Sequence, residues 1–297
     1  MKSIKYSMVI PVYNEEEGIR GVLVDVKKSL EKLDGDYEIV IVDDASSDRS
    51  IDIVKNFDRN IRIVKHEENE GYGASILDGV RAAKSNTVII IDADGTYPAN
   101  EIPNLVKYSK DYALVTSSRT GKNVKIPLVR RPGKFFHTKL ISFLVGMHIP
   151  DMNSGLRVFK KDVFMKFASL YPKGFSISTT FLLSCITNDY PVKFIPIDYY
   201  KRKGKSKIKI FRDGYNFVLL ILKTVTYFNP LRIFMPISIA FLVLGLAWLI
   251  YNLITILNIP DASVLLITLS IIIGIFGLMA DMISRLFKNI YLEQKTD

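Results

Sequence analysis

The sequence predicts an α/β fold with a mostly parallel sheet, followed by amphipathic helices and a two-helix transmembrane hairpin. Short apolar runs alternate with amphipathic helical patterns through the first two thirds of the chain, which is typical of βαβ units. Several of these runs end in acidic or polar clusters. Residues 231–257 and 263–286 then form two long apolar stretches. These observations predict a ligand-binding domain over residues 1–208 that is joined to a membrane anchor over residues 231–288.

The expected elements follow one another at short intervals. Strands are expected over residues 8–12, 38–42, 61–64, 88–91, 113–118 and 192–200. Helices are expected over residues 15–33, from Ser46 or Ser47 as the cap to about Phe57, from the Gly71-Tyr72-Gly73 turn to Ala83, and over much of 164–188. A polar turn at 151–155 leads into a further strand.

The stretch around Asp92-Ala-Asp94 is the centre of the pattern. An unbroken apolar run, Val88 to Ile91, fits a strand buried on both faces, and turn residues follow the two aspartates. Carboxylates at such a strand end face the crevice where open α/β sheets bind ligands. Because two nearby carboxylates repel each other, they favour a cation, and a divalent metal that also holds a diphosphate would suit them. The alternative is that one aspartate caps the turn and the other is solvated.

Two other strand ends carry comparable clusters, Asn14-Glu15 and Asp43-Asp44. A row of such ends along one sheet edge indicates a nucleotide pocket, with some carboxylates for ribose and base and others for a metal. The Gly71-x-Gly73 pair by itself indicates only a tight turn.

The charge balance indicates an anionic partner. The chain of 297 residues has a formal net charge of +10, from 40 Lys and Arg against 30 Asp and Glu. The excess gathers in residues 119–132 and 201–207, which are either solvated loops or phosphate-binding loops. The single cysteine, Cys185, excludes an intrachain disulfide, and three histidines make a His/Cys zinc site a poor fit.

The remaining segments point to a membrane. Residues 133–147 and 209–229 are expected to be amphipathic helices, and a basic, aromatic helix of this kind either lies on a bilayer surface or covers the core. The apolar stretches are near or above the ~20 residues that span a bilayer. The turn between them has no Lys or Arg, whereas the flanks are basic. The positive-inside rule therefore places both termini and the large domain in the cytoplasm, at the cell membrane.

Taken together, the motifs resemble those of a family 2 glycosyltransferase with the GT-A fold, which implies a mixed, mostly parallel sheet. More narrowly, the chain is similar to the polyprenyl-phosphate hexose synthases, such as dolichyl-phosphate mannose synthase and its bacterial glucosyl relatives. The matching stretches cover most of residues 6–207 in family order: Val9–Glu16, Ile39–Asp48, Asn69–Gly73, Asp92–Pro98, Asn153–Phe159 and Gly204–Lys207.

The resemblance implies a nucleotide-diphosphate sugar as donor, polyprenyl or dolichyl phosphate as acceptor, the lipid bilayer as a further partner, and no nucleic acid. It implies that Asp92 and Asp94 hold the diphosphate through Mg²⁺ or Mn²⁺. Many relatives have Gln where this chain has Thr96, which leaves open whether Thr96 contacts the metal. The other implied roles concern the nucleotide (Pro11, Tyr13, Glu15, Asp43, Asp44, Gly71), the phosphates (Arg119, Arg130, Arg131, Arg202, Lys205) and the sugar or acceptor pocket (Asp151, Asn153, Ser154).

The implied reaction is an inverting transfer of a hexose, mannose or glucose, with no obligatory protein base because the acceptor phosphate is already anionic. Three rival classes are a haloacid-dehalogenase-type phosphatase with Asp92 as nucleophile, a processive polysaccharide synthase, and a non-catalytic membrane protein that keeps the nucleotide fold. The sequence leaves open the sugar, the base, the lipid chain and whether the protein is a homo-oligomer.

Overall fold

The computed structural model describes residues 4–121, 139, 141–143, 145–172, 177–200, 219, 226 and 229–293. The chain forms two compact units. The first comprises residues 1–142 and 147–218, and the second comprises residues 143–146 and 219–297. The expected amphipathic helices over 133–147 and 209–229 lie largely outside the described residues, so their membrane-surface role stays a prediction.

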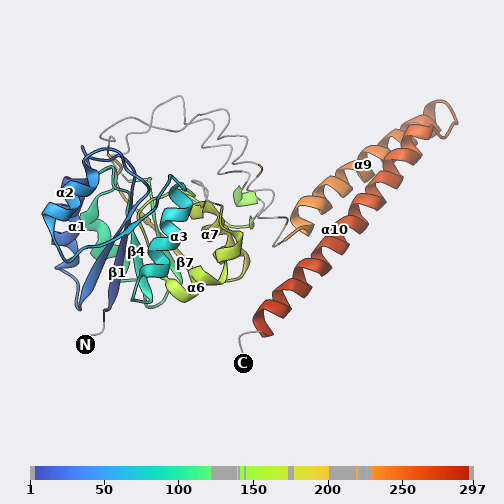
Figure 1. The fold of residues 1–297 in the computed structure, drawn as a ribbon. Coiled ribbons are helices and arrows are strands. Elements are labelled where there is room, and N and C mark those ends of the chain that lie inside the picture. Colours follow the sequence, from blue (N-terminus) through green and yellow to red (C-terminus); the bar gives the residue numbers. More distant parts are fainter. Residues whose placement is uncertain are drawn as a thin grey trace. The chain divides into compact units, whose positions relative to one another are not determined.

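The first unit alternates strands and helices, as the sequence pattern predicts (Figure 1). Its strands are β1 (Tyr6–Val12), β2 (Tyr37–Asp43), β3 (Arg62–Lys65), β4 (Thr87–Ile90), β5 (Leu114–Ser118), β6 (Arg157–Lys160) and β7 (Val192–Pro196). Its helices are α1 (Ile19–Leu30), α2 (Ser50–Phe57), α3 (Tyr72–Ala82), η1 (Ala99–Glu101), α4 (Ile102–Val106), α6 (Lys161–Lys166), η3 (Ala168–Leu170) and α7 (Ile177–Thr187).

The strands form one mixed, mostly parallel sheet in the order β3-β2-β1-β4-β6-β5-β7. Among these seven strands, β6 alone runs antiparallel to its neighbours, β4 and β5. The strand order reverses between β1 and β4, because β2 and β3 continue on one side of β1 and β4 lies on the other. The carboxyl ends of parallel strands at such a switch point are where open α/β sheets bind ligands.

Helices cover both faces of the sheet, which is why the central strands are apolar throughout (Figure 1). On one face, α1 buries an apolar stripe at helical spacing: Ile19, Val22, Leu23, Val26 and Leu30. On the other face, α3 approaches β1 and β2 so closely that a Cβ atom on Gly79 would overlap the side chain of Val9. A stack of aromatic rings, Phe159, Phe164 and Phe181, joins β6 to α6 and α7.

Several expected boundaries and one expected cap differ from the structure. The first helix begins at Ile19 rather than at residue 15, because Glu15 to Gly18 form a turn in which the Glu15 carbonyl accepts the amides of Gly18 and Ile19. The last strand ends at Pro196 rather than at residue 200, because after the Ile197 amide bonds the Ser118 carbonyl the chain leaves β5, and the Tyr200 amide bonds Thr96 instead.

The expected cap of α2 is also wrong: the N-cap is Arg49, without a side-chain cap hydrogen bond, and Asp48 rather than Ser46 or Ser47 binds the first residue of the helix. The Oδ1 atom of Asp48 accepts the amide of Ser50 at 2.9 Å. Burial alone would raise the pKa of Asp48, but the hydrogen bonds from Ser50 outweigh it and lower that pKa.

The second unit contains the predicted helical hairpin, α9 (Leu231–Thr255) and α10 (Asp261–Glu293), shown in orange and red in Figure 1. Residues Leu231–Thr255 and Asp261–Leu286 are long and apolar enough to cross a bilayer, and few of them are buried within the protein. The two helices touch through small residues. A Cβ atom on Gly277 would lie 2.7 Å from Phe234, and the Ser238 hydroxyl donates to the Ser270 carbonyl at 2.9 Å.

Candidate functional site

The polar strand ends of β1, β2 and β4 meet at one edge of the sheet, because these three strands are neighbours and run parallel. Pro11 is the penultimate residue of β1 and pairs with Val42 of β2. Tyr13 and Glu15 follow the strand, and all three residues are half-buried. Asn14 and Ala45 have positive φ angles of 53° and 58°. Left-handed backbone at non-glycine residues gathers at functional sites, and here it marks the ends of two adjacent strands.

Hydrogen bonds join the loops after β1 and β2 into one surface. The amide of Asn14 donates to the Ser46 hydroxyl at 3.2 Å, and the Asn14 side-chain oxygen accepts the Ser47 amide at 2.7 Å. The Glu15 amide donates to the Ser50 hydroxyl at 2.8 Å. The predicted nucleotide residues of β1 are therefore held in fixed register with those of β2.

The two aspartates after β2 have different partners. Asp43 accepts the Ser46 amide at 2.9 Å. Asp44 accepts the amides of Glu70 and Gly71, at 2.8 and 3.0 Å, one on each carboxylate oxygen. Asp44 thus fixes the turn that begins α3, and its predicted contact with nucleotide stays a prediction.

His66, for which the sequence predicted no role, also contacts Asp44. His66, buried after β3, places Nδ1 2.8 Å from Asp44 and Nε2 3.4 Å from Asp78. A single histidine after a short strand has no spacing signal, so only the folded chain reveals that it lies between two carboxylates.

Asp92 follows β4 and is half-buried. Its Oδ1 atom accepts the hydroxyl of Tyr72, the first residue of α3, at 2.9 Å. Burial and the Asp92 charge together raise the pKa of Tyr72 well above its ordinary value, so the phenol stays a donor. From another side Gly155 packs so closely that a Cβ atom there would overlap the Asp92 carboxylate.

Asp94 has its own local support. Its Oδ1 atom accepts the Thr96 amide at 3.1 Å and the Thr96 hydroxyl at 2.7 Å. Gly95 between them adopts a φ of +71°, a conformation that glycine tolerates without strain. Asp94 therefore does cap the turn, as one sequence interpretation expected, and Thr96 orients it. Whether Thr96 also contacts a metal stays a prediction.

Arg119 and Asp151 form a buried, two-pronged ion pair. Nε and Nη2 of Arg119 donate to the two oxygens of Asp151 at 2.7 and 2.8 Å, and the Arg119 amide adds a bond of 2.9 Å. The guanidinium also lies over the ring of Tyr199, 5.2 Å from its centroid, and Tyr199 packs edge-on against Tyr97. Arg119 therefore has a structural partner in addition to its predicted phosphate contact.

Asn153 and Ser154, the other predicted pocket residues, also bond within the protein. The Asn153 side chain accepts the Thr179 hydroxyl, and the Ser154 hydroxyl bonds that of Ser117. Both contacts tie the turn after Asp151 to the folded core. Their predicted role toward sugar or acceptor stays a prediction.

The sequence alone assigned no role to Arg157, although Arg157 lies in the Asn153–Phe159 stretch that resembles the family. Its guanidinium is fully buried, and it donates to the backbone carbonyls of Ser154, Ser178 and Met152. Burial lowers the pKa of Arg157. Arg157 thus holds the 152–154 turn, which in turn brings Gly155 against Asp92.

The two basic segments begin next to each other. The amide of Gly121, near the start of the first, donates to the Ile197 carbonyl at 2.9 Å. The amide of Tyr200, just before the second, donates to the carbonyl of Thr96 at 3.0 Å. The predicted phosphate residues in these segments lie outside the described residues: Arg130, Arg131, Arg202 and Lys205.

The donor set at this edge suits a hard divalent cation. The described residues include no group of three or more His, Cys, Asp or Glu side chains placed to hold a metal. Asp92 and Asp94 nevertheless present carboxylates at one loop, and the absence of a side chain at Gly155 leaves the Asp92 carboxylate unobstructed on that side. Mg²⁺ binds through one or two carboxylates plus substrate phosphates, so a pair of aspartates fits such an ion.

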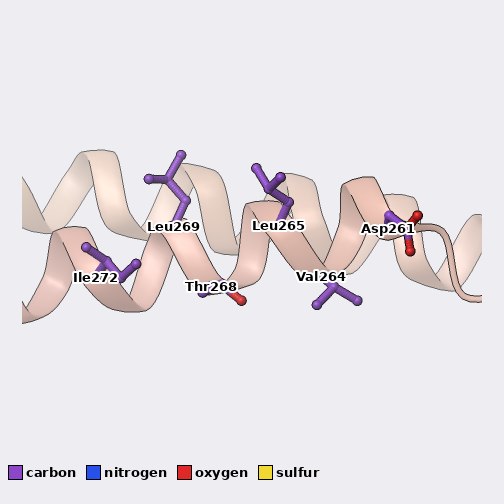
Figure 2. A pocket seen from close by; sticks show the side chains of 6 residues that line it. All are labelled: Asp261, Val264, Leu265, Thr268, Leu269 and Ile272. Atoms are coloured by element: carbon purple, nitrogen blue, oxygen red, sulfur yellow. The ribbon is translucent and has the colours of Figure 1, made fainter.

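A separate hollow lies on α10 and has a different character (Figure 2). It measures about 470 Å³ and is lined by Asp261, Val264, Leu265, Thr268, Leu269 and Ile272. All of its walls come from one face of one apolar helix, and it has one titratable side chain. We therefore place the candidate site at the aspartate edge and not at this hollow.

Comparison with known protein families gives two matches. Residues 7–167 match the glycosyl transferase family 2 model, and residues 229–286 match the GtrB C-terminal hairpin model. The two matches fall on the sheet and on the helical hairpin, respectively.

Curated relatives agree with these families. The chain is 29% identical over 210 residues to a dolichyl-phosphate hexose transferase of Haloferax volcanii, covering 70% of this chain and 88% of the relative. It is 31% identical over 162 residues to an undecaprenyl-phosphate 4-deoxy-4-formamido-L-arabinose transferase of Aeromonas hydrophila. That match covers 53% of this chain and spans about half of the relative, 49%.

Among solved structures, the chain is similar to glucosyl-3-phosphoglycerate synthase from Mycobacterium tuberculosis. One crystal structure, in complex with Mn²⁺, uridine-diphosphate-glucose and phosphoglyceric acid, superposes with a TM-score of 0.60 at 18% identity. The superposition covers 75% of this chain and 80% of that one. At this level of identity the similarity concerns the fold, and it agrees with the predicted GT-A architecture.

Proposed function

The chain belongs to glycosyl transferase family 2, and on that premise we propose an inverting transfer of a hexose, mannose or glucose, from a nucleotide-diphosphate sugar to polyprenyl or dolichyl phosphate. The observation that carries the proposal is the link from Asp94 to the start of the second basic segment: Thr96 donates to Asp94, and the Thr96 carbonyl accepts the amide of Tyr200. The two curated relatives described above are named as dolichyl-phosphate and undecaprenyl-phosphate sugar transferases, which supports a lipid-phosphate acceptor.

The donor's nucleotide is assigned to the edge formed by β1 and β2. Pro11, Tyr13 and Glu15 line the end of β1, and Asp43 ends β2. Their loops are joined by the Asn14 and Glu15 hydrogen bonds, so the surface is pre-organised before the nucleotide arrives. A protein of the same fold, glucosyl-3-phosphoglycerate synthase, has been crystallised with uridine-diphosphate-glucose, which supports a nucleotide-sugar donor for this chain.

The diphosphate is assigned to Asp92 and Asp94, which would hold Mg²⁺ or Mn²⁺. A bound divalent ion of this kind neutralises charge on the diphosphate leaving group. Asp94 keeps its orientation through the amide and hydroxyl of Thr96.

The acceptor needs orientation more than activation. Phosphate monoesters have a second pKa of about 6, so the attacking oxygen is already anionic near neutrality. Asp151 is an unsuitable base, because both of its oxygens accept bonds from Arg119. We assign acceptor or donor phosphates to Arg119, Arg130, Arg131, Arg202 and Lys205, and the sugar or acceptor pocket to Asn153 and Ser154.

The hairpin is assigned to the cell membrane, with both termini and the catalytic domain in the cytoplasm. The domain division follows from this: a catalytic domain over residues 1–208, an interfacial helix over 209–229 and two spans over 231–288. Family membership decides against the haloacid-dehalogenase-type phosphatase, and the names of the curated relatives favour a transferase over a non-catalytic protein. A processive synthase would yield polymer, which the assay below detects.

The direct test uses the full-length protein in detergent. It is incubated with a panel of nucleotide sugars, Mg²⁺ or Mn²⁺, and either polyprenyl phosphate or the same polyprenol without phosphate. We expect a single sugar on the lipid phosphate and none on the free alcohol. Asp94→Asn should lower kcat by about 10²- to 10³-fold, as for other electrostatic stabilisers, while the unfolding midpoint stays near that of the wild type. Activity retained by Asp94→Asn, or in excess EDTA, would contradict the metal assignment.

The orientation is tested by cysteine labelling in intact cells. Cys185 is buried, and burial raises the pKa of its thiol. The wild-type protein should therefore react little with the maleimide and serves as the background control. Ala262→Cys, at the exposed start of α10, should react with a membrane-impermeant maleimide, whereas Asp25→Cys on exposed α1 should not. The reverse pattern would refute a cytoplasmic catalytic domain.

A further inference from the structure

Tyr72 links two parts of the sheet edge that are not adjacent. It begins α3, and its hydroxyl donates to Asp92 Oδ1 at 2.9 Å. Asp92 follows β4, whereas the turn before Tyr72 is bound to the end of β2 by Asp44. Since β1 lies between β2 and β4, the Tyr72 side chain spans from the nucleotide end of the edge to the diphosphate end.

The backbone before Tyr72 is built to place this side chain. Gly71 has a φ of +96°, which favours glycine, and its amide donates to Asp44 at 3.0 Å. The Ser75 hydroxyl and amide both bond the Gly71 carbonyl, which closes the first turn of α3. Hydrogen bonds therefore hold the backbone on both sides of Tyr72. The position of Asp44 thus determines the direction in which the Tyr72 side chain leaves α3.

Asp92 is confined between two neighbours. Gly155 packs against its carboxylate, and the Tyr72 hydroxyl binds one of its oxygens. A half-buried carboxylate that accepts a hydrogen bond and has backbone packed against it has little freedom to rotate. The hydroxyl of Tyr72 thus favours the carboxylate rotamer of Asp92 that places Oδ1 within hydrogen-bond distance of it.

We propose that Tyr72 is a positioning residue for the divalent-metal and diphosphate site, because it orients Asp92 and transmits the position of Asp44 to it. This inference rests on the proposed function, since it assigns Tyr72 a task at the same site. Tyr72 acts on the metal only through Asp92 and not as a ligand. Its loss therefore weakens metal binding but does not abolish it.

The test measures metal binding in the absence of turnover. Full-length protein in detergent is titrated with Mn²⁺, alone and with UDP or GDP, and free Mn²⁺ is followed by electron paramagnetic resonance. Tyr72→Phe removes only the hydroxyl, and we expect Mn²⁺ to bind roughly 10- to 100-fold more weakly, as when other partners of metal ligands are removed. Tyr171→Phe is the matched control, because its buried hydroxyl bonds the Phe164 carbonyl at 2.8 Å.

A double-mutant cycle separates positioning from general stability. If Tyr72 acts through Asp92, Tyr72→Phe should add little to the weakening already caused by Asp92→Asn. Independent, additive effects would overturn the inference, as would wild-type Mn²⁺ affinity in Tyr72→Phe or equal weakening in Tyr171→Phe. If the wild type binds no Mn²⁺, the metal assignment of the proposed function fails first, so the two failures are distinguishable.

Discussion

The aspartate edge of the first unit and the helix pair of the second bury opposite kinds of side chain. At the aspartate edge, Asp44, Asp94 and Asp151 are almost fully buried, and each accepts several hydrogen bonds. In the helix pair, large apolar side chains such as Ile254 and Leu265 are 78% and 65% exposed. There the buried residues include Ser238, Ser270 and Asn252.

The contrast shows which solvent each unit is built for. In water, an apolar core drives folding, and buried charges persist only where partners compensate their desolvation. In hydrocarbon, exposed leucines have no tendency to pack together, so helices associate through small residues and hydrogen bonds. The same chain therefore follows two sets of packing rules, and removing one polar contact should have very different effects in the two units.

The largest expected effect is on the Arg119–Asp151 pair. Asp151→Ala leaves a largely buried guanidinium without its carboxylate and should lower the free energy of unfolding by about 3 kcal/mol, the lower end for broken buried pairs. Chemical denaturation of the detergent-solubilised protein measures it. Asp34→Ala, which breaks the exposed Lys5–Asp34 pair, is the control and should leave the midpoint unchanged. If Asp151→Asn abolishes activity without destabilising the fold, Asp151 is a base rather than an anchor.

The next effect concerns the space around Asp92. Gly155→Ala places a methyl group where the Asp92 carboxylate lies and should lower kcat by about 10- to 100-fold, because small displacements of reacting groups are costly. Gly21→Ala is the matched control, since a Cβ atom there meets nothing within 4 Å. On the solvent-facing side of α1 that change should stabilise the fold by about 0.5–1 kcal/mol. Wild-type kcat in Gly155→Ala would mean that Asp92 tolerates displacement.

The smallest effect is expected in the helix pair. Ser238→Ala removes the bond to the Ser270 carbonyl and should weaken helix association by about 0.6 kcal/mol, the average for such bonds in membranes. Ser263→Ala is the control, because the buried Ser263 hydroxyl has no hydrogen-bond partner in the described part of the chain. Unfolding of the protein in mixed micelles measures both. A loss of 2 kcal/mol or more at Ser238 would show that the hairpin follows the rules of a water-soluble core.

Local patterns were sufficient to predict the order of the elements. Periodic apolar positions placed β1, α1 and β4, and the length and charge of residues 231–286 predicted the hairpin. The start of α2 was predicted wrongly because several neighbouring residues could cap it. Asp48 bonds the amide of Ser50, the first residue of α2, and residue type alone did not distinguish Asp48 from Ser46 and Ser47.

The sequence by itself determined which residues stand at strand ends, because strand length and turn residues are local properties. Asp43, Asp92 and Asp94 could therefore be assigned before any coordinates. Only the tertiary structure decided what orients them. The contact of Tyr72 with Asp92 spans 20 residues, and the pair of Arg119 with Asp151 spans 32. Such pairs depend on strand order and on the exact start of a helix, which are set by packing across the whole sheet.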